Sequence, residues 1–412
     1  GEKAVQTVKK GQITLKMKKI LSALLASAVA MSLVAGCGGE KKEDAKASDV
    51  IKVGVFLPLT GDNAAGGELE LRGIKLANKL HPEVLGKKIE LVVADNKSDK
   101  AEAASVAARL IEKDKVSVIV GSYGSSLSMA AGNIVKDSKV PAVGTSCTNP
   151  QVTANNDYYF RACFIDPFQG TVMANYAGIT KECKTAAVIS QNGDDYSTGL
   201  ANYFKAAYKG DLVYEGTYNT NESDFNAILT AAKAKNPEVI FCPSSIATAG
   251  LVIKQARELG ITCPIMAGDT WENETIIQNA GAENCEGVTF STFFDENDPT
   301  AADFVKGFKE YLNSDSKNIK LNGGSDGVAA VSALGYDTYN VIVDAIEKAD
   351  STDSTAIRDA LAQLKTTGVT GDLSFDENGD ANKNMAYIKT VKDGKFVFIG
   401  TQSTDGKFTA VD

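Results

Sequence analysis

Short apolar runs alternate with amphipathic stretches from about residue 51 to residue 292. The runs are rich in valine and isoleucine, which is typical of strands buried on both faces of a parallel sheet. The stretches between them repeat apolar residues at helical spacing, which predicts helices that cover the sheets. The expected strands are 51–57, 89–94, 116–121, 140–144, 185–190, 212–218, 239–243, 265–267 and 288–292, and the expected helices are 69–80, 100–114, 127–137, 198–208, 225–234, 248–259 and 274–280.

These units are too numerous for one sheet of ordinary size. We therefore expect an α/β fold with two doubly wound parallel-sheet lobes. The carboxyl-terminal part has a different pattern, because long helical stretches are followed by short strands with Gly, Asp and Asn turns, which predicts an antiparallel meander. The expected helices there are 302–312, 328–348 and 355–364, and the expected strands are 371–375, 386–391 and 395–399.

The amino-terminal residues have the composition of a secretory signal. A basic start at Met17 is followed by a 17-residue run of small and apolar residues from Ile20 to Gly36, short of the roughly 20 that span a bilayer. The ending Val-Ala-Gly-Cys resembles a bacterial lipobox, which implies cleavage before Cys37 and lipidation of its thiol. An uncleaved anchor helix is the alternative.

The residues on either side of the signal predict no folded structure. We expect residues 1–16 to be upstream sequence before a natural start at Met17, so that 1–36 comprises upstream residues and the signal peptide. Residues 37–49 are small and charged, which predicts a flexible tether. We expect an extracytoplasmic protein that is lipid-anchored to the cell membrane, either periplasmic or at the cell surface.

Charge and missing motifs exclude several classes of function. The net charge is -9, and residues 1–36 carry six lysines and one glutamate, so the body is more acidic still, which disfavours nucleic acid as a partner. His81 is the only histidine, so neither a Ser-His-Asp triad nor a multi-histidine metal site is expected. The chain has no CxxC pair, P-loop or GxSxG motif, and no GxGxxG after a strand. We expect no metal, no cofactor and no enzyme; a secreted α/β enzyme is the minor alternative.

Polar loops at expected strand ends are candidates for a ligand site, because open α/β sheets bind ligands there. Residues 121–126 place hydroxyl groups at a helix start, which suits an anion such as a carboxylate. The alternative is an N-cap with a tight turn. In the loop 144–150, Thr148 can donate to a carboxylate and the Ser146 carbonyl can accept from an ammonium; the alternative is a solvated loop.

Two further loops supply candidates from the second half of the chain. Tyr196 follows the strand 185–190, and Asp269 follows the strand 265–267. A carboxylate at Asp269 can neutralise an ammonium, and the neighbouring Trp271 can form an apolar wall. Asp269 can equally be a helix cap. A zwitterion needs both donors and acceptors away from water, and these four loops together offer both.

The order of these features resembles a known family. The segment 51–61, Ile-Lys-Val-Gly-Val-Phe-Leu-Pro-Leu-Thr-Gly, is followed by 121–126, 141–150, Tyr-Phe-Arg at 159–161 and Phe-Gln-Gly at 168–170. Over residues 50–412 the chain resembles the periplasmic leucine/isoleucine/valine-binding protein family of ABC transporters.

The resemblance implies a type I periplasmic binding protein fold, in which a three-segment hinge joins two lobes that close on a ligand. We place the crossovers near Asp166, Phe293 and Gly368. Lobe one would then comprise 50–166 plus 293–367, and lobe two would comprise 167–292 plus 368–412.

The resemblance also implies roles for single residues in binding an amino acid. The best-known members have a glutamate at the position of Asp269, so the shorter aspartate needs lobe closure or a water to reach the ligand. A tyrosine of those members falls near Gly66, so we expect an enlarged or reshaped side-chain pocket. The implied contacts are Ser125 for the α-carboxylate, the Ser146 carbonyl for the α-ammonium, Thr148 for both groups, Tyr196 from the second lobe, Asp269 for the ammonium, and Tyr123, Gly124 and Trp271 near the side chain.

We therefore expect a monomeric binding protein that captures a branched-chain or other apolar amino acid and delivers it to an ABC permease and its ATPase. A short amide, urea or aromatic acid is the alternative cargo, and a ligand-sensing partner of a receptor is the alternative role. Among the cysteines, a Cys263–Cys285 bridge is possible, and a Cys163–Cys183 bridge is a weaker hypothesis. Cys147 and Cys242 are expected near the cleft as free thiols.

Overall fold

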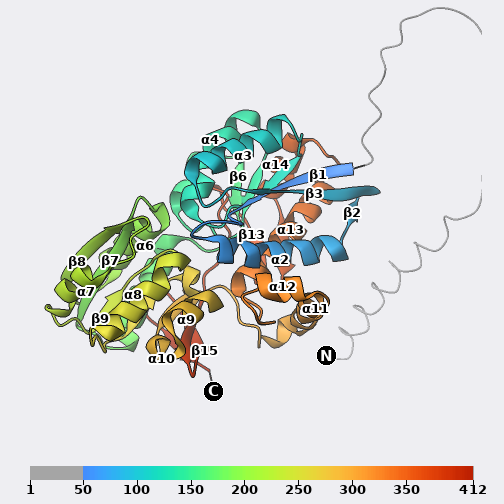
Figure 1. Ribbon diagram of the computed structural model, residues 1–412. Helices are drawn as coiled ribbons and strands as arrows, with labels where there is room; N and C mark the ends of the chain where they lie inside the picture. The colour runs from blue at the N-terminus through green and yellow to red at the C-terminus, as the bar shows by residue number, and fades with distance from the viewer. Residues whose placement is uncertain (1–49, 412) are drawn as a thin grey trace, which may run out of the picture. The chain divides into compact units, whose positions relative to one another are not determined.

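The computed structural model of the protein describes residues 50–411 (Figure 1). The predicted signal, lipidation site and tether lie outside the described residues. Residues from Ser48 to the carboxyl end form one compact unit, which contains two large sheets. We call the first sheet with its covering helices lobe one, and the second sheet with its helices lobe two.

The sheet of lobe one has parallel strands throughout, except at one edge. Its strands are β1 (Val50–Leu57), β2 (Glu83–Val84), β3 (Lys87–Asp95), β4 (Val118–Val120), β5 (Ala142–Gly144) and β6 (Tyr159–Arg161). They are ordered β2-β3-β1-β4-β5-β6, and only β2 is antiparallel to its neighbour. Successive side chains of β1 point to opposite faces, so Val53 and Val55 join one hydrophobic core and Phe56 joins the other.

Helices cover both faces of this sheet. They are α2 (Ala64–Leu80), α3 (Lys100–Glu112), α4 (Ser125–Ser138), α11 (Ala302–Asn313), α12 (Ser316–Leu321), α13 (Ala330–Ala349) and α14 (Ser354–Ala362). Helices α2 and α13 pack against each other on one face, and α3 and α4 pack together on the other (Figure 1). This double cover explains the continuous buried apolar runs of β4 and of β1 from residue 53 to residue 57.

The sheet of lobe two is parallel in its first part and antiparallel in its second. Its strands are β7 (Thr185–Asn192), β8 (Asp211–Asn219), β9 (Val239–Phe241), β10 (Ile265–Ala267), β11 (Thr289–Thr292), β14 (Ala386–Lys392), β15 (Lys395–Gln402) and β16 (Phe408–Ala410). They are ordered β16-β15-β14-β11-β10-β9-β7-β8. The helices of this lobe are α5 (Asp166–Asn175), α6 (Asp195–Ala207), α7 (Asn226–Lys233), α8 (Ile246–Glu258), α9 (Glu274–Ala280) and α10 (Ala282–Cys285).

Short helical turns and a hairpin complete the described chain. They are η1 (Pro150–Val152), η2 (Tyr176–Thr180), η3 (Asp269–Trp271), η4 (Pro299–Ala301), β12 (Lys365–Gly368) and β13 (Gly371–Ser374). The chain passes between the lobes three times, after β6, after β11 and after β13. The α/β fold with two doubly wound lobes is therefore confirmed, while the residue boundaries given above for the lobes stay predictions.

The predicted meander was partly wrong. The strand expected at 371–375 pairs with β12 in a separate two-stranded hairpin, and the meander of lobe two consists of β14, β15 and β16. The reason is Asp337 on α13, a buried carboxylate that accepts hydrogen bonds from the backbone N–H groups of Val369 and Thr370, both at 2.8 Å. These bonds fasten the hairpin turn to lobe one.

The predicted disulfides are not formed, because all six described cysteines are free thiols. Cys163 lies beside Cys147 and Arg161, whereas Cys183 contacts the Glu238 carbonyl in lobe two. Arg257 separates the other proposed pair, since its guanidinium donates both to the carbonyl of Cys263 and to the carbonyl that precedes Cys285.

The crossing of α2 and α13 provides a stability test. A Cβ on Gly73 would lie 1.9 Å from the Ser332 carbonyl oxygen, so the Gly73→Ala variant must push two helices apart. We expect a loss of about 1–3 kcal/mol in the free energy of unfolding, measured in urea. Gly307→Ala on α11 is the matched control: its Cβ meets nothing within 4 Å, and we expect a gain of about 0.5–1 kcal/mol. Equal effects of the two substitutions would contradict the close crossing.

Candidate ligand-binding site

The carboxyl ends of the parallel strands of the two lobes face each other across a closed gap. Ser126, in the first turn of α4, donates to Asp195 Oδ2 at 2.9 Å and accepts from the Asp195 N–H at 2.8 Å. Asn149 donates to the Asp195 carbonyl at 2.9 Å, and Lys100 forms an ion pair with the Asp195 carboxylate at 2.9 Å. The start of α6 in lobe two is thus joined directly to the loops of lobe one.

Arg161 holds the loop that follows β5. Its buried guanidinium donates to the carbonyls of Cys147 at 2.8 Å and Asn149 at 2.5 Å. It also pairs with Asp380 at 2.5 Å, and Asp380 lies on the chain between β13 and β14. A charge-assisted network therefore fixes the loop at 145–150 and ties it to a connection between the lobes.

Glu70 fastens the same loop from the other side. This residue of α2 is fully buried, and its two carboxylate oxygens accept hydrogen bonds from the hydroxyls of Thr145 and Ser146. Burial is the largest effect on Glu70 and raises its pKa to about 8. Ser146 therefore uses its side chain to hold the loop, and the role of its carbonyl as a ligand acceptor stays a prediction.

Asp269 is the predicted acceptor for an ammonium, and it is almost fully buried. Its Oδ1 accepts from the Tyr196 hydroxyl at 3.1 Å, and its backbone N–H donates to Gln169 Oε1 at 2.9 Å. Its Oδ2 is buried without a hydrogen-bond partner among residues 50–411. Burial raises the pKa of Asp269 to about 7. The helix-cap alternative is wrong, because the side chain does not cap η3, whose N-cap is Gly268.

Two other buried oxygens share this feature. Thr148 Oγ1 and Asp166 Oδ2 also lack a partner within the described chain. The Thr148 hydroxyl lies beside the Asp166 carboxylate without hydrogen-bond geometry, and burial together with the charge of Asp269 raises the pKa of Asp166 to about 8. Lobe one, the first crossover and lobe two thus each contribute one buried oxygen without a partner, and the three residues lie near one another.

The start of α4 offers the complementary donors. Ser125 is the first residue of the helix, and its Oγ accepts from the Asn149 N–H at 3.1 Å, so its own O–H is left to donate. No side chain caps this helix, since the N-cap position is Gly124. The N-cap alternative is therefore wrong for this loop. Free N–H groups and the helix dipole make the site suitable for a carboxylate.

Two aromatic side chains bound the region, and both are buried. The Tyr123 ring packs on Gly66, where an added Cβ would lie 2.4 Å from the ring. The Tyr123 ring thus occupies the space beside Gly66, while an enlarged or reshaped side-chain pocket stays a prediction. Trp271 is held by a hydrogen bond of 3.1 Å from its indole N–H to Ser244 Oγ.

The structure therefore brings the predicted residues to one gap from both lobes. The carboxylates of Asp269, Glu70 and Asp194 all raise the pKa of Tyr123 beyond the effect of its burial, which shows how close the lobes are. The groups that support the site could not be identified from the sequence, with one exception. A charged residue inside an apolar helix face, such as Glu70, is a signal that could have indicated a supporting role. The missed groups are Glu70, Ser126, Asn149, Asp166, Gln169 and Asp195.

Two doubly wound lobes around an enclosed polar site define a two-lobed solute-binding protein. The chain belongs to the periplasmic binding protein family, whose model matches residues 50–395. Among the described helices, none is long and apolar enough to cross a membrane.

Its relatives include several named amino-acid-binding proteins. The leucine-binding protein LivK of Thermotoga maritima is 36% identical, with a TM-score of 0.80 over 87% of this chain and 100% of that one. LivJ of Streptococcus pneumoniae, solved with isoleucine, is 32% identical, with a TM-score of 0.77 over 84% and 97% of the two chains. A Leu/Ile/Val-binding protein homolog of Brucella melitensis is 29% identical over 84% of this chain and 93% of its own.

The buried carboxyl groups predict a pH dependence of stability. In the folded protein the pKa is about 7 for Asp269 and about 8 for Asp166 and Glu70, against ordinary values near 4. The folded state therefore keeps protons that the unfolded state releases, and stability present below pH 4 is lost as pH rises through 7 to 8. We expect the Tm of the ligand-free protein to fall from pH 5 to pH 8, measured by calorimetry.

The variant Asp269→Asn removes one of these titrations and should flatten the profile. Asp303→Asn, an exposed carboxylate on α11, is the matched control and should leave the slope unchanged. A slope that is identical in wild type and Asp269→Asn would exclude Asp269 as a contributor.

Proposed function

We propose that the protein is an extracytoplasmic solute-binding lipoprotein that captures a free α-amino acid between its two lobes and delivers it to an ABC permease. The observation that carries this proposal is the set of three buried oxygens without partners, Thr148 Oγ1, Asp166 Oδ2 and Asp269 Oδ2, opposite the donor-rich start of α4. One end of the site accepts and the other donates, which matches the two ends of a zwitterion.

The ammonium end is the more strongly defined. Burying a carboxylate away from water is costly unless a charged donor meets it, and the charge of Asp269 adds to the effect of burial on the pKa of Asp166. An α-ammonium supplies three N–H donors for Asp269, the Ser146 carbonyl and Thr148, and its positive charge also lowers the cost of burying Asp166. The relatives solved or named with leucine, isoleucine and valine support this cargo class.

The same charges disfavour the alternative cargoes. An aromatic acid with no amine would add a negative charge beside two buried carboxylates, and urea or a short amide would leave them without a counter-charge. A sensory role uses the same capture step and differs only in the partner.

Delivery and anchoring complete the proposal. Motifs for nucleotide binding do not occur in the sequence, so the energy for transport would come from the permease and its ATPase. Lipidation of Cys37 would hold the protein at the membrane, with residues 37–49 as the tether. We assign no catalytic role to the site.

A ligand screen followed by one substitution tests the binding function. Thermal shift with the twenty amino acids, urea and benzoate should identify amino acids as the stabilising class, because a ligand at 100 times its Kd adds about 2.7 kcal/mol. With the best amino acid, Asp269→Asn should weaken the Kd by tenfold or more in calorimetry, since the ammonium loses its counter-charge.

Asp303→Asn serves again as the control and should bind as wild type does. Unchanged affinity in Asp269→Asn would reject the assigned role of this residue. Stabilisation by benzoate or urea, with no response to any amino acid, would reject the proposed function.

A further inference from the structure

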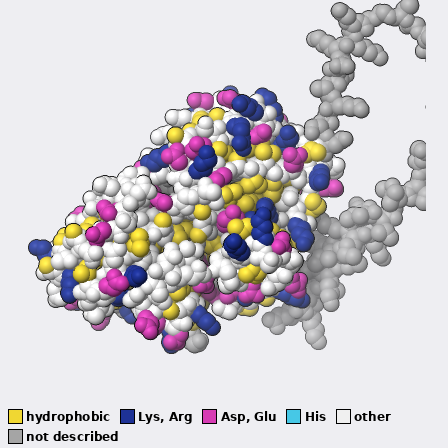
Figure 2. Space-filling view, in the orientation of Figure 1, with side chains coloured by type: hydrophobic (Ala, Val, Ile, Leu, Met, Phe, Trp, Pro, Cys, Tyr) yellow, Lys and Arg dark blue, Asp and Glu magenta, His cyan; other side chains and the backbone are white. Residues whose placement is uncertain are grey.

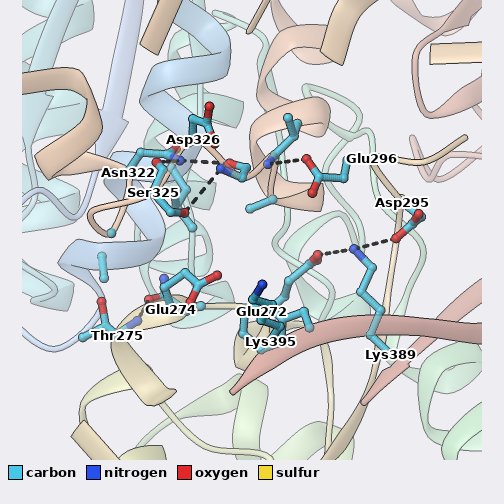
Figure 3. A pocket seen from close by; sticks show the side chains of 18 of the residues that line it. Glu272, Glu274, Thr275, Asp295, Glu296, Asn322, Ser325, Asp326, Lys389 and Lys395 are labelled. Carbon is cyan, nitrogen blue, oxygen red and sulfur yellow. Dashed lines mark hydrogen bonds and ion pairs between the residues drawn. The ribbon is translucent and has the colours of Figure 1, made fainter. Parts of the chain in front are cut away.

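A cavity lies between the lobes, near the candidate amino-acid site. It has a volume of about 590 Å³, and we call it the side chamber (Figure 3). Lobe one contributes the start of α2, the chain at 295–297 and the loop 322–329, and lobe two contributes residues 272–275, Lys389 and the β14–β15 turn. A cavity of this size is within the range of small-molecule sites.

The side chamber adjoins the ligand site through two shared segments. On α2, Ala65 and Leu69 line the chamber, while the alternate neighbours Gly66 and Glu70 contact Tyr123 and the loop after β5. On the segment after η3, Glu272 lines the chamber directly after Trp271. If the α-ammonium of a ligand contacts Asp269, a long side chain of that ligand can therefore extend into the chamber.

Most charges of the side chamber are already paired. Lys389 is buried and forms ion pairs with Glu272 at 2.5 Å and with Asp295 at 3.3 Å. Glu296 pairs with Lys309 at 3.0 Å. These groups form the walls in Figure 3 and need nothing further from a ligand.

Two acceptors of the side chamber are not paired. Asn322 is 2% exposed, and its Nδ2 donates to the carbonyls of Ser325 and Gly327, both at 2.9 Å, which fixes the amide orientation. Its Oδ1 has no partner among residues 50–411 but is closed to solvent, so a ligand in the chamber does not contact this oxygen.

Glu274 is the second acceptor, and its carboxylate forms no ion pair within the described chain. Its stem packs near Gly323 on the facing lobe. Burial, with the charges of Glu272 and Glu296, raises the pKa of Glu274. Lys395 also lines the chamber, but it is exposed at the rim. A positive charge placed beside Glu274 would relieve the cost of its burial, whereas an aliphatic group would leave this carboxylate without a partner.

We propose that the side chamber binds the terminal ammonium or guanidinium of the cargo's side chain, so that the protein selects a long basic amino acid such as lysine or arginine. This rests on the proposed function and narrows its cargo class. It replaces the apolar side chain expected from the family resemblance. The Glu274 carboxylate is the specificity-determining acceptor.

Lysine and norleucine form the decisive ligand pair, because they have the same carbon chain and differ only by the terminal ammonium. In calorimetry, wild-type protein should bind lysine at least tenfold more tightly than norleucine or leucine. Glu274→Gln should weaken the affinity for lysine tenfold or more and change the affinity for norleucine less than twofold. Glu274→Asp, which keeps the charge, should restore most of the preference for lysine. Glu258→Gln, an exposed carboxylate at the end of α8, is the matched control and should leave the ratio unchanged.

The possible results distinguish a failure of this inference from a failure of the proposed function. Binding of leucine or norleucine as tight as that of lysine in wild type would overturn the inference and keep the proposed function. Equal losses for lysine and norleucine in Glu274→Gln would also overturn it, because the residue would then be structural. Failure of every amino acid to bind would overturn both proposals.

Discussion

The structure depends on two buried carboxyl groups that have no cationic partner in the described chain and whose pKa values burial raises to about 7 and about 8. Asp269 and Asp166 lie in an enclosed region between the lobes, and each presents one oxygen with no partner in the described chain. Another buried cluster is paired within the protein, since Lys389 meets both Glu272 and Asp295. The contrast marks the interlobe region as a place built to receive a donor from outside, since an unpaired buried carboxylate destabilises the closed form.

The surrounding fold serves to hold these oxygens in place. Arg161 and Glu70 fix the loop after β5 from two sides, and Gln169 and Tyr196 orient Asp269 from lobe two. Because each of these supports is buried, the groups facing the ligand have little freedom to move away from each other. Preorganised acceptors bind a charged group without first having to be ordered, which keeps the entropic cost of binding low.

The α/β architecture could be predicted from the sequence because its signal is local. Continuous Val/Ile runs and helical spacing define strands and helices segment by segment, and the lobe count follows from their number. The strand at 371–375 was assigned to the wrong sheet because its partner is chosen by Asp337, more than 30 residues earlier. Hydrogen bonds between residues so distant leave no periodic trace in the sequence.

Some residues of the candidate site could likewise be predicted from the sequence, and others could not. Ser125, Thr148 and Asp269 could be chosen because they follow strands, where the fold places ligand sites. Glu70 and Asp166 could not, because their roles arise only when α2 and the first crossover fold against the loop after β5. The ring of Tyr123 on Gly66 is a third such case, since only the packing shows that this ring occupies the space beside Gly66.

Closure of the two lobes follows from the same balance of charge. Direct contacts join the lobes at two places: Ser126, Asn149 and Lys100 meet Asp195 at one, and Glu272 with the Ala330 N–H, Gln278 with the Gly323 carbonyl and Lys389 with Asp295 make up the other. The exposed ion pair of Lys100 with Asp195 contributes about 0–1 kcal/mol. Against them stands the cost of removing Asp269 and Asp166 from water. A ligand that brings a positive charge removes this cost only in the closed form, so it binds that form more tightly and shifts the population toward it. The unpaired carboxylates therefore recognise the ligand and, by the same interaction, make closure depend on its presence.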